Sequence, residues 1–297
     1  MVSRDTQGRR RPALARVGRT RFLRLASRMG QERLLRLEAR RKRNPALRAA
    51  AAPLRWWVRR GSIRVTAGAG EHLRLSMAHL PLGHAHAGAL PRGWLEVSVQ
   101  EAFRRLLGPG DVLYDIGANI GFFSLVGAGF VEPGGRVYAF DPVPENADAV
   151  RANAALNRID NVTVLERAVG AARGRDRLLR VEDLSWSQLE SQGWHPRTVD
   201  AVEVEVVPID ELVASGELSP PTLVKIDVEG AELDVVRGMA DTLARHRPAI
   251  VCELHDTAAA FVELMEGYGY SVENLEGTGP VAETPRTAHA LALPPPR

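Results

Sequence analysis

Short apolar runs alternate with longer segments of helical periodicity along most of this chain. The runs have the length and composition of buried strands, and they lie at residues 112–116, 136–140, 162–166, 223–227 and 250–254. Helical spacing of apolar residues predicts helices at residues 94–107, 122–130, 144–157, 231–245 and 257–267. Strands that alternate with helices indicate an α/β fold, with a doubly wound, mainly parallel sheet covered on both faces.

Two further pairs of apolar runs lie outside this alternation. Residues 176–181 and 202–207 predict extra strands around a loop at residues 185–194. Residues 270–274 and 288–293 predict a hairpin that closes the sheet.

The first strand leads into a glycine turn whose sequence, at residues 115–121, is DIGANIG. Doubly wound sheets bind ligands at the carboxyl ends of their strands, where the strand order reverses. The turn lacks the third glycine of the G-x-G-x-x-G dinucleotide fingerprint, and the carboxylate of Asp115 would repel a pyrophosphate. The same carboxylate attracts a cation, so the turn favours a ligand such as S-adenosylmethionine, with its ammonium group, over a nicotinamide dinucleotide.

Asp141 lies 26 residues after Asp115, at the end of the next predicted strand. A carboxylate there can accept hydrogen bonds from both hydroxyls of a ribose. Both aspartates could instead cap helices or satisfy turns. The strand–turn–helix context of the pair favours a nucleoside site.

Several stretches of the chain resemble the FkbM-type methyltransferases, which have the class I S-adenosylmethionine-dependent fold. The two specific stretches are GDVLYDIGANIGFFS at residues 110–124 and LVKIDVEGAELDVVRG at residues 223–238. Weaker ones follow the family's order, and together they span about residues 108–275. The family more often has glutamate where this chain has Asp141.

The resemblance implies a seven-stranded, Rossmann-like methyltransferase sheet and S-adenosyl-L-methionine as the cofactor. The cofactor-binding residues that it implies are Asp115, Gly117, Asn119, Gly121, Asp141 and Glu166. It also implies O-methylation of a sugar or of a secondary metabolite such as a polyketide.

Two residues at neighbouring strand ends are candidates for catalysis. Asp227 ends the fourth strand, and His255 follows the fifth. A hydroxyl acceptor must lose a proton, so a nearby base would help the transfer. His255 could equally be a packed or capping histidine. We expect Lys225 to pair with one of the glutamates that open the next helix, Glu229 or Glu232.

The overall charge of +3 hides a strong asymmetry. Residues 1–60 hold 19 arginines and lysines against three acidic residues, whereas the remainder holds 20 against 33. We expect residues 1–60 to be a basic, partly helical arm. Such an arm could bind nucleic acid or an anionic membrane surface, but a solvated tail is favoured.

The remaining composition narrows the class of protein. The single cysteine, Cys252, excludes an intramolecular disulfide and a four-cysteine zinc site. The N-terminus has no apolar core of the kind that a secretory signal needs, which favours a cytoplasmic location. Near His72, His79, His84 and His86 the sequence has no cysteine and no set of carboxylates that would complete a group of metal ligands, so we expect no metal site.

These observations divide the chain into four parts. After the arm come a substrate-side segment at residues 61–107, the methyltransferase domain at residues 108–293 and a tail at residues 294–297. We expect an S-adenosylmethionine-dependent O-methyltransferase for a small-molecule or glycoside acceptor. The alternatives are a methyltransferase for RNA or protein, a non-catalytic nucleotide-binding module, and a dehydrogenase.

Overall fold

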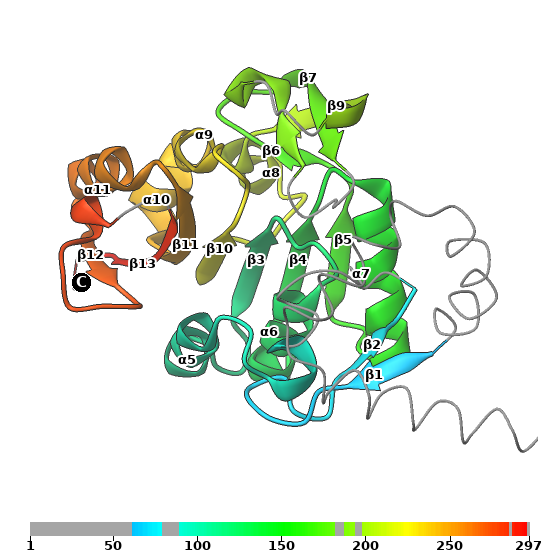
Figure 1. Ribbon diagram of the computed structural model, residues 1–297. Coiled ribbons are helices and arrows are strands. Elements are labelled where there is room, and N and C mark those ends of the chain that lie inside the picture. The colour runs from blue at the N-terminus through cyan, green and yellow to red at the C-terminus, as the bar shows by residue number, and fades with distance from the viewer. Residues whose placement is uncertain (1–60, 79–88, 182–186, 194–197, 285–286, 296–297) are drawn as a thin grey trace, which may run out of the picture.

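The fold is described from a computed structural model (Figure 1), which covers residues 61–78, 89–181, 187–193, 198–284 and 287–295. The basic arm at residues 1–60 lies outside these ranges, as do His79, His84 and His86. No helix within the ranges is long and apolar enough to cross a membrane.

A sheet of seven hydrogen-bonded strands forms the centre of the molecule. From one edge to the other the strands are β12 (Ser271–Asn274), β13 (Thr287–Leu293), β11 (Ala249–His255), β10 (Leu223–Ile226), β3 (Val112–Ile116), β4 (Arg136–Phe140) and β5 (Val162–Leu165). Five neighbouring strands, from β11 to β5, are parallel, and β13 is antiparallel to both of its neighbours. This arrangement confirms the doubly wound, mainly parallel α/β sheet and its closing hairpin.

The strand order reverses beside β3. From β3 the chain moves outward through β4 to β5, and it later returns to β10 and β11 on the other side of β3. Such a reversal leaves a crevice at the carboxyl ends of β3 and β10, where open α/β sheets bind ligands.

Helices cover both faces of this sheet (Figure 1). One face carries α5 (Val97–Leu106), α6 (Phe122–Val131) and α7 (Pro144–Asn157). The opposite face carries α8 (Ile209–Ala214), α9 (Glu232–Arg237), α10 (Ala240–His246) and α11 (Ala258–Gly267). Short 3-10 turns lie at Leu90–Arg92, Glu190–Gln192 and Val281–Glu283.

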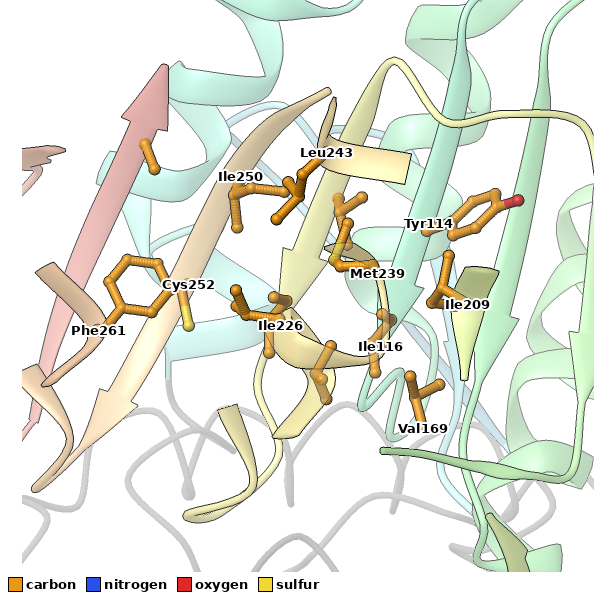
Figure 2. Packing of buried hydrophobic residues seen from close by; sticks show 14 of the residues in the cluster. Tyr114, Ile116, Val169, Ile209, Ile226, Met239, Leu243, Ile250, Cys252 and Phe261 are labelled. Carbon is orange, nitrogen blue, oxygen red and sulfur yellow. The ribbon is translucent and has the colours of Figure 1, made fainter. Parts of the chain in front are cut away.

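Side chains along each strand point alternately to the two faces of the sheet, and an apolar core lies on each face. Tyr114 on β3 and Ile226 on β10 pack under α8–α11, in the core that Figure 2 shows. Leu113 and Leu223 point to the other face and pack under α5 and α6. Because side chains alternate with period two, Lys225 lies on that second face, above the ring of Phe123.

A smaller, four-stranded sheet stands beside the carboxyl ends of the main strands (Figure 1). Its strands, in spatial order, are β6 (Ala168–Val169), β9 (Thr198–Val207), β7 (Gly174–Val181) and β8 (Gln188–Leu189). The extra strands predicted at residues 176–181 and 202–207 are the antiparallel pair β7 and β9 of this sheet. A hairpin of β1 (Ser62–Arg64) and β2 (Arg74–Ser76), which the sequence did not suggest, packs against α7.

The helix predicted at residues 231–245 is two helices, α9 and α10, separated at Gly238 and Met239. A Cβ atom on Gly238 would lie 2.0 Å from the backbone oxygen of Gly170, so the chain is pressed against the loop after β6 at this point. Asp210 then caps α10, because its carboxylate accepts hydrogen bonds from the backbone N–H groups of Asp241 and Thr242. A long-range contact and a distant cap therefore break a pattern that is locally continuous.

Candidate active site

A cleft opens at the carboxyl edge of the main sheet, where the strand order reverses. About 660 Å³ of empty space lies within it, part of which is open to solvent. Gly117, Asn119 and Asp141 line it from the ends of β3 and β4, Asp227 from the end of β10, and Gln188 from the second sheet. The topology and the cleft thus agree on one location for a ligand.

The glycine turn brings the ends of β3 and β10 into backbone contact. Gly117 has a φ of +84°, and a Cβ atom there would lie 1.8 Å from the backbone oxygen of Asp227. Only glycine fits such a position. Asn119 also has a positive φ, of 51°, and its backbone N–H donates a 2.8 Å hydrogen bond to Asp141. The turn therefore holds the cleft ends of β3, β4 and β10 together.

Asp115 lies directly beneath this turn and is fully buried. The hydroxyl of Ser124 donates a 2.5 Å hydrogen bond to its Oδ2, and Lys225 Nζ lies 4.0 Å from its Oδ1. Within the described part of the chain, Oδ1 has no hydrogen-bond partner. Burial raises the pKa of Asp115. A cationic ligand group beside the turn would relieve this buried charge, so the residues fit the methionine end of S-adenosylmethionine.

Asp141 is nearly buried and is held by three donor groups. The backbone N–H groups of Asn119 and Val143 and the side-chain amide of Asn146 donate to its two oxygens, at 2.8–3.2 Å. A carboxylate can accept about four hydrogen bonds, so a further donor in the cleft can be accommodated. Burial raises the pKa of Asp141 to about 7.

Three of the predicted cofactor residues, Asp115, Gly121 and Glu166, lie outside the cleft lining. Gly121, with a φ of +82°, is the N-cap residue of α6. Glu166 is 42% exposed in its side chain and forms a 2.5 Å ion pair with Arg151 on α7. A direct contact between Glu166 and the cofactor remains a prediction.

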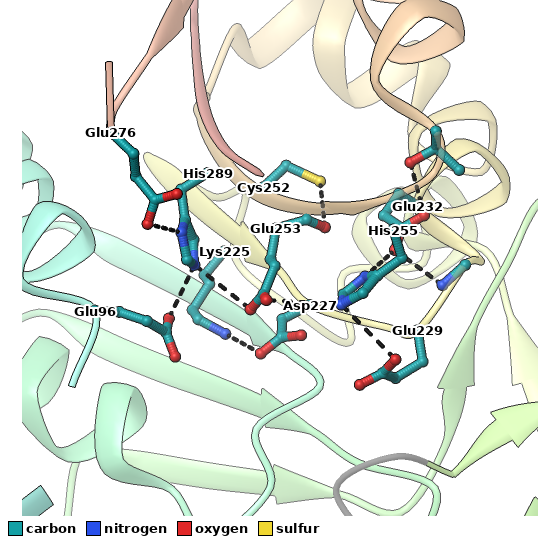
Figure 3. Close-up of polar contacts among 12 residues, drawn as sticks. Glu96, Lys225, Asp227, Glu229, Glu232, Cys252, Glu253, His255, Glu276 and His289 are labelled. Carbon is teal, nitrogen blue, oxygen red and sulfur yellow. Dashed lines mark hydrogen bonds and ion pairs between the residues drawn. The ribbon is translucent and has the colours of Figure 1, made fainter. Parts of the chain in front are cut away.

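Asp227, the first candidate for catalysis, lies on the cleft wall. Its Oδ2 accepts a 3.0 Å hydrogen bond from Lys225 Nζ (Figure 3). Lys225 therefore pairs with Asp227 and Asp115, and the expected pairing with Glu229 or Glu232 was wrong. Burial alone would lower the pKa of Lys225, but the charges of Asp227 and Asp115 raise it above its usual value. The ammonium group therefore stays charged.

His255, the second candidate, lies beside the cleft and does not line it. Its Nδ1 is 2.7 Å from Glu232 Oε1, and its Nε2 is 3.7 Å from both Glu229 Oε2 and Glu253 Oε1. Burial alone would lower the pKa of His255, but the hydrogen bond with Glu232 and the charge of Glu229 raise it to about 9. Carboxylates thus face both ring nitrogens.

A second histidine and two glutamates join this cluster, and sequence reasoning missed their association. Glu253 on β11 is directly opposite His289 on β13, and its Oε2 lies 3.5 Å from His289 Nε2. Glu96, which precedes α5, lies 3.4 Å from the same nitrogen. Figure 3 shows Glu253 between the two histidines. The alternation of side chains along the strands could have indicated this association. It places Glu253 on the same face of the sheet as Lys225, which is the face that α5 covers.

The chain is similar in sequence to known methyltransferases. The profile of the Methyltransferase FkbM domain family matches residues 115–272, which is more than half of the chain. The 31-O-demethyl-FK506 methyltransferase FkbM of Streptomyces tacrolimicus is 29% identical over 223 residues, which cover 64% of this chain and 85% of that protein.

Other relatives match over shorter stretches. The hexuronic acid methyltransferase AglP of Haloferax volcanii is 32% identical over 149 residues, 49% of this chain and 56% of AglP. The 2-O-methyltransferase NoeI of Sinorhizobium fredii is 28% identical over 47% of this chain and 61% of its own length. Among solved structures, a methyltransferase FkbM from Methylobacillus flagellatus superposes with a TM-score of 0.43 at 17% identity, over 65% of this chain and 50% of that one.

Proposed function

The chain belongs to the FkbM methyltransferase family, and from this premise we propose that it transfers a methyl group from S-adenosylmethionine to a hydroxyl oxygen of a sugar or a secondary metabolite. One observation carries the proposal. Two carboxylates, Asp115 and Asp227, flank the buried ammonium group of Lys225 at the ends of β3 and β10. The surplus negative charge suits a cationic cofactor, and Asp227 faces the cleft where an acceptor would enter.

The glycine turn and the two buried aspartates would hold the cofactor. Asp115 and the turn from Gly117 to Gly121 would receive the methionine end, and Asp141 would accept hydrogen bonds from the ribose hydroxyls. We retain Glu166 and Asn119 as contacts on the nucleoside side. When bound, S-adenosylmethionine supplies a methyl group on a positively charged sulfur.

Asp227 is the proposed base. It is the candidate that lines the cleft, and its side chain is 26% exposed there. As the acceptor oxygen attacks the methyl carbon, its proton would pass to the carboxylate of Asp227. The bond between that carbon and the cofactor's sulfur would break, which leaves S-adenosylhomocysteine as the second product. Holding the two reactants in line would supply much of the acceleration, and the base would add roughly 10²–10⁴-fold. We propose that His255 positions the acceptor from the side of the cleft.

The acceptor class is argued from the relatives and from the chemistry of the walls. FkbM, AglP and NoeI carry names that describe O-methylation or methylation of a sugar acid. Asn146, Arg167, Gln188 and Glu229 give the cleft donors and acceptors that a hydroxyl-rich molecule can satisfy. A glycoside or hydroxylated polyketide is therefore favoured over an apolar acceptor. The family membership decides against the dehydrogenase and the non-catalytic module.

A methyl-transfer assay with labelled S-adenosylmethionine tests the proposal. The purified chain would be offered uronic acids, other glycosides, macrocyclic polyketides, RNA and a peptide that contains isoaspartate. We expect label in a glycoside or polyketide, in a product that survives mild alkali because methyl ethers do and methyl esters do not. Label confined to RNA or to an alkali-labile peptide product would contradict the proposed acceptor class.

Two aspartate variants test whether Asp227 acts as the base. Asp227→Asn should lower kcat by roughly 10²–10⁴-fold while S-adenosylhomocysteine still binds. Asp148→Asn is the matched control, because Asp148 forms an exposed ion pair with Arg151 on α7. Full turnover in Asp227→Asn would remove Asp227 from the mechanism without touching the methyltransferase assignment.

A further inference from the structure

His289 is a buried histidine whose outer nitrogen faces two carboxylates without a hydrogen bond. The residue is 7% exposed. Its Nε2 lies 3.4 Å from Glu96 Oε2 and 3.5 Å from Glu253 Oε2. Within the residues that the structure describes, neither His289 Nε2 nor Glu96 Oε2 has a hydrogen-bond partner. Such buried polar atoms are uncommon in folded proteins, and an ion is one kind of partner that would satisfy them.

The opposite side of the same imidazole ring fixes its orientation. His289 Nδ1 lies 2.7 Å from Glu276 Oε1. A histidine that binds a metal usually donates its other N–H to a carboxylate or a carbonyl, which leaves the lone pair on the ligating nitrogen. Glu276, His289 and the two facing carboxylates have this arrangement.

The two contacts of His289 Nε2 fit an ion better than a shared proton. A protonated imidazole would donate charge-assisted hydrogen bonds of about 2.7–2.9 Å, and both contacts are clearly longer. Metal bonds of about 2.0–2.2 Å at tetrahedral angles place neighbouring ligand atoms roughly 3.3–3.6 Å apart. The measured 3.4 and 3.5 Å fall within this range.

From this geometry we propose that Glu96, Glu253 and His289 bind a divalent transition-metal ion. One candidate ligand atom from each of the three residues lies within 4.8 Å of the others. One imidazole nitrogen with two carboxylate oxygens suits Zn²⁺ or Mn²⁺ better than Mg²⁺, which prefers oxygen ligands alone. Three protein ligands leave a coordination position open for water or another oxygen.

The fold assembles this site from three separate parts of the chain. Glu253 and His289 are directly paired across β11 and β13, and Glu96 comes from the residue before α5. An ion would therefore fasten the start of α5 to the main sheet, beside Lys225 and Asp227 (Figure 3).

A neighbouring set of ligands, Asp227, Glu253 and His255, shares Glu253 and is the competing location. There, Asp227 already accepts a hydrogen bond from Lys225, and the contacts of His255 Nε2 are longer, at 3.7 Å. The unpartnered atoms lie at His289 and Glu96, which decides between the two locations.

Metal binding by the full, tag-free chain tests the proposal without cofactor or acceptor. After chelation and dialysis, we expect calorimetric titration with Zn²⁺ or Mn²⁺ to give one ion per chain, with Mg²⁺ binding far more weakly. His289→Ala and Glu96→Gln, which each remove a ligand, should weaken metal binding by at least about 10–100-fold. Glu276→Gln, which changes only the hydrogen-bond partner of His289 Nδ1, should weaken it by about 10–100-fold.

The matched controls are His246→Ala, at the end of α10, and His255→Ala, at the competing location. Both should bind the ion as the unaltered chain does. Far-UV circular dichroism and the melting temperature of each metal-free variant report whether it has folded. Uptake of less than one ion per chain, uptake that survives in folded Glu96→Gln and His289→Ala, or uptake lost only in His255→Ala would overturn the proposal. Because no methyl transfer is measured, these outcomes are independent of the proposed function.

Discussion

Replacing Asp141 by asparagine should change how the stability of this protein depends on pH. Burial raises the pKa of Asp141 from 3.8 to about 7 in the folded protein. Between these values the folded state keeps a proton that the unfolded state has lost. Stability from this group is therefore fully present below pH 4 and is lost as the pH rises through 7.

The size of the effect follows from the shift. Each unit of pKa difference corresponds to about 1.4 kcal/mol, so the full window represents about 4 kcal/mol. Between pH 5 and pH 7, which is easily measured, the wild-type chain should lose about 2 kcal/mol through Asp141. Asparagine does not titrate, so the variant lacks this dependence.

Asparagine also disturbs the hydrogen bonds that Asp141 accepts. The two carboxylate oxygens accept backbone N–H groups from Asn119 and Val143, and an amide can accept only one of them. The other N–H is left unpaired, at a cost of roughly 1–3 kcal/mol that does not vary with pH. The two effects can be separated because only the titration of Asp141 makes the free energy of unfolding depend on pH.

Urea denaturation at pH 5, 6, 7 and 8 measures both. We expect the free-energy difference between wild type and Asp141→Asn to shrink by about 2 kcal/mol from pH 5 to pH 7. Asp148→Asn, at an exposed ion pair, should run parallel to wild type. A difference between wild type and Asp141→Asn that stays constant over this range would refute the reasoning.

Three other predictions concern the turn, the second catalytic candidate and the arm. Gly117→Ala should abolish calorimetric binding of S-adenosylhomocysteine, because its Cβ would meet a backbone oxygen at 1.8 Å; Gly134→Ala, with a similar φ of +89° and open space, should lose only about 1–2 kcal/mol of stability. Comparable binding by both variants would contradict the role of the turn. His255→Ala should raise KM for the acceptor more than it lowers kcat, because His255 is proposed to position the acceptor and, unlike Asp227, does not line the cleft. A loss of kcat like that of Asp227→Asn would make His255 the base. Deleting residues 1–50 should leave affinity for S-adenosylhomocysteine unchanged, because the predicted cofactor residues begin at Asp115, and a tenfold loss would place part of the site in the arm. Salt-dependent binding of RNA or anionic vesicles by the full chain alone would give the arm a function.

Local pattern was sufficient for most of the fold. The strands β3 and β4 and the helix α7 have the bounds that the sequence predicts, because an uninterrupted apolar run or a helical period specifies them locally. The break between α9 and α10 depends on contact with Gly170 and on capping by Asp210. Neither contact is encoded near the break, so a single continuous helix was predicted.

The site divides in the same way. Asp115, Asp141 and Asp227 follow strands directly, so their place at one edge of the sheet could be predicted. The contact of Lys225 with Asp115 could not, because Asp115 lies opposite it on β3, more than a hundred residues earlier in the sequence. Glu96 and His289 join Glu253 only through the packing of α5 and the pairing of β13 with β11. For this reason the proposed metal site could not be predicted from local sequence pattern.

Calorimetric titration of the full chain with S-adenosylhomocysteine tests the central claim most directly. We expect micromolar binding, about −8 kcal/mol at 1 μM, with one site per chain. Asp141→Ala should weaken it by roughly 1–3 kcal/mol, while Asp148→Ala should not. Binding of NADH in place of S-adenosylhomocysteine, or no binding of either, would contradict the claim that the cleft between β3 and β10 holds the methyl donor.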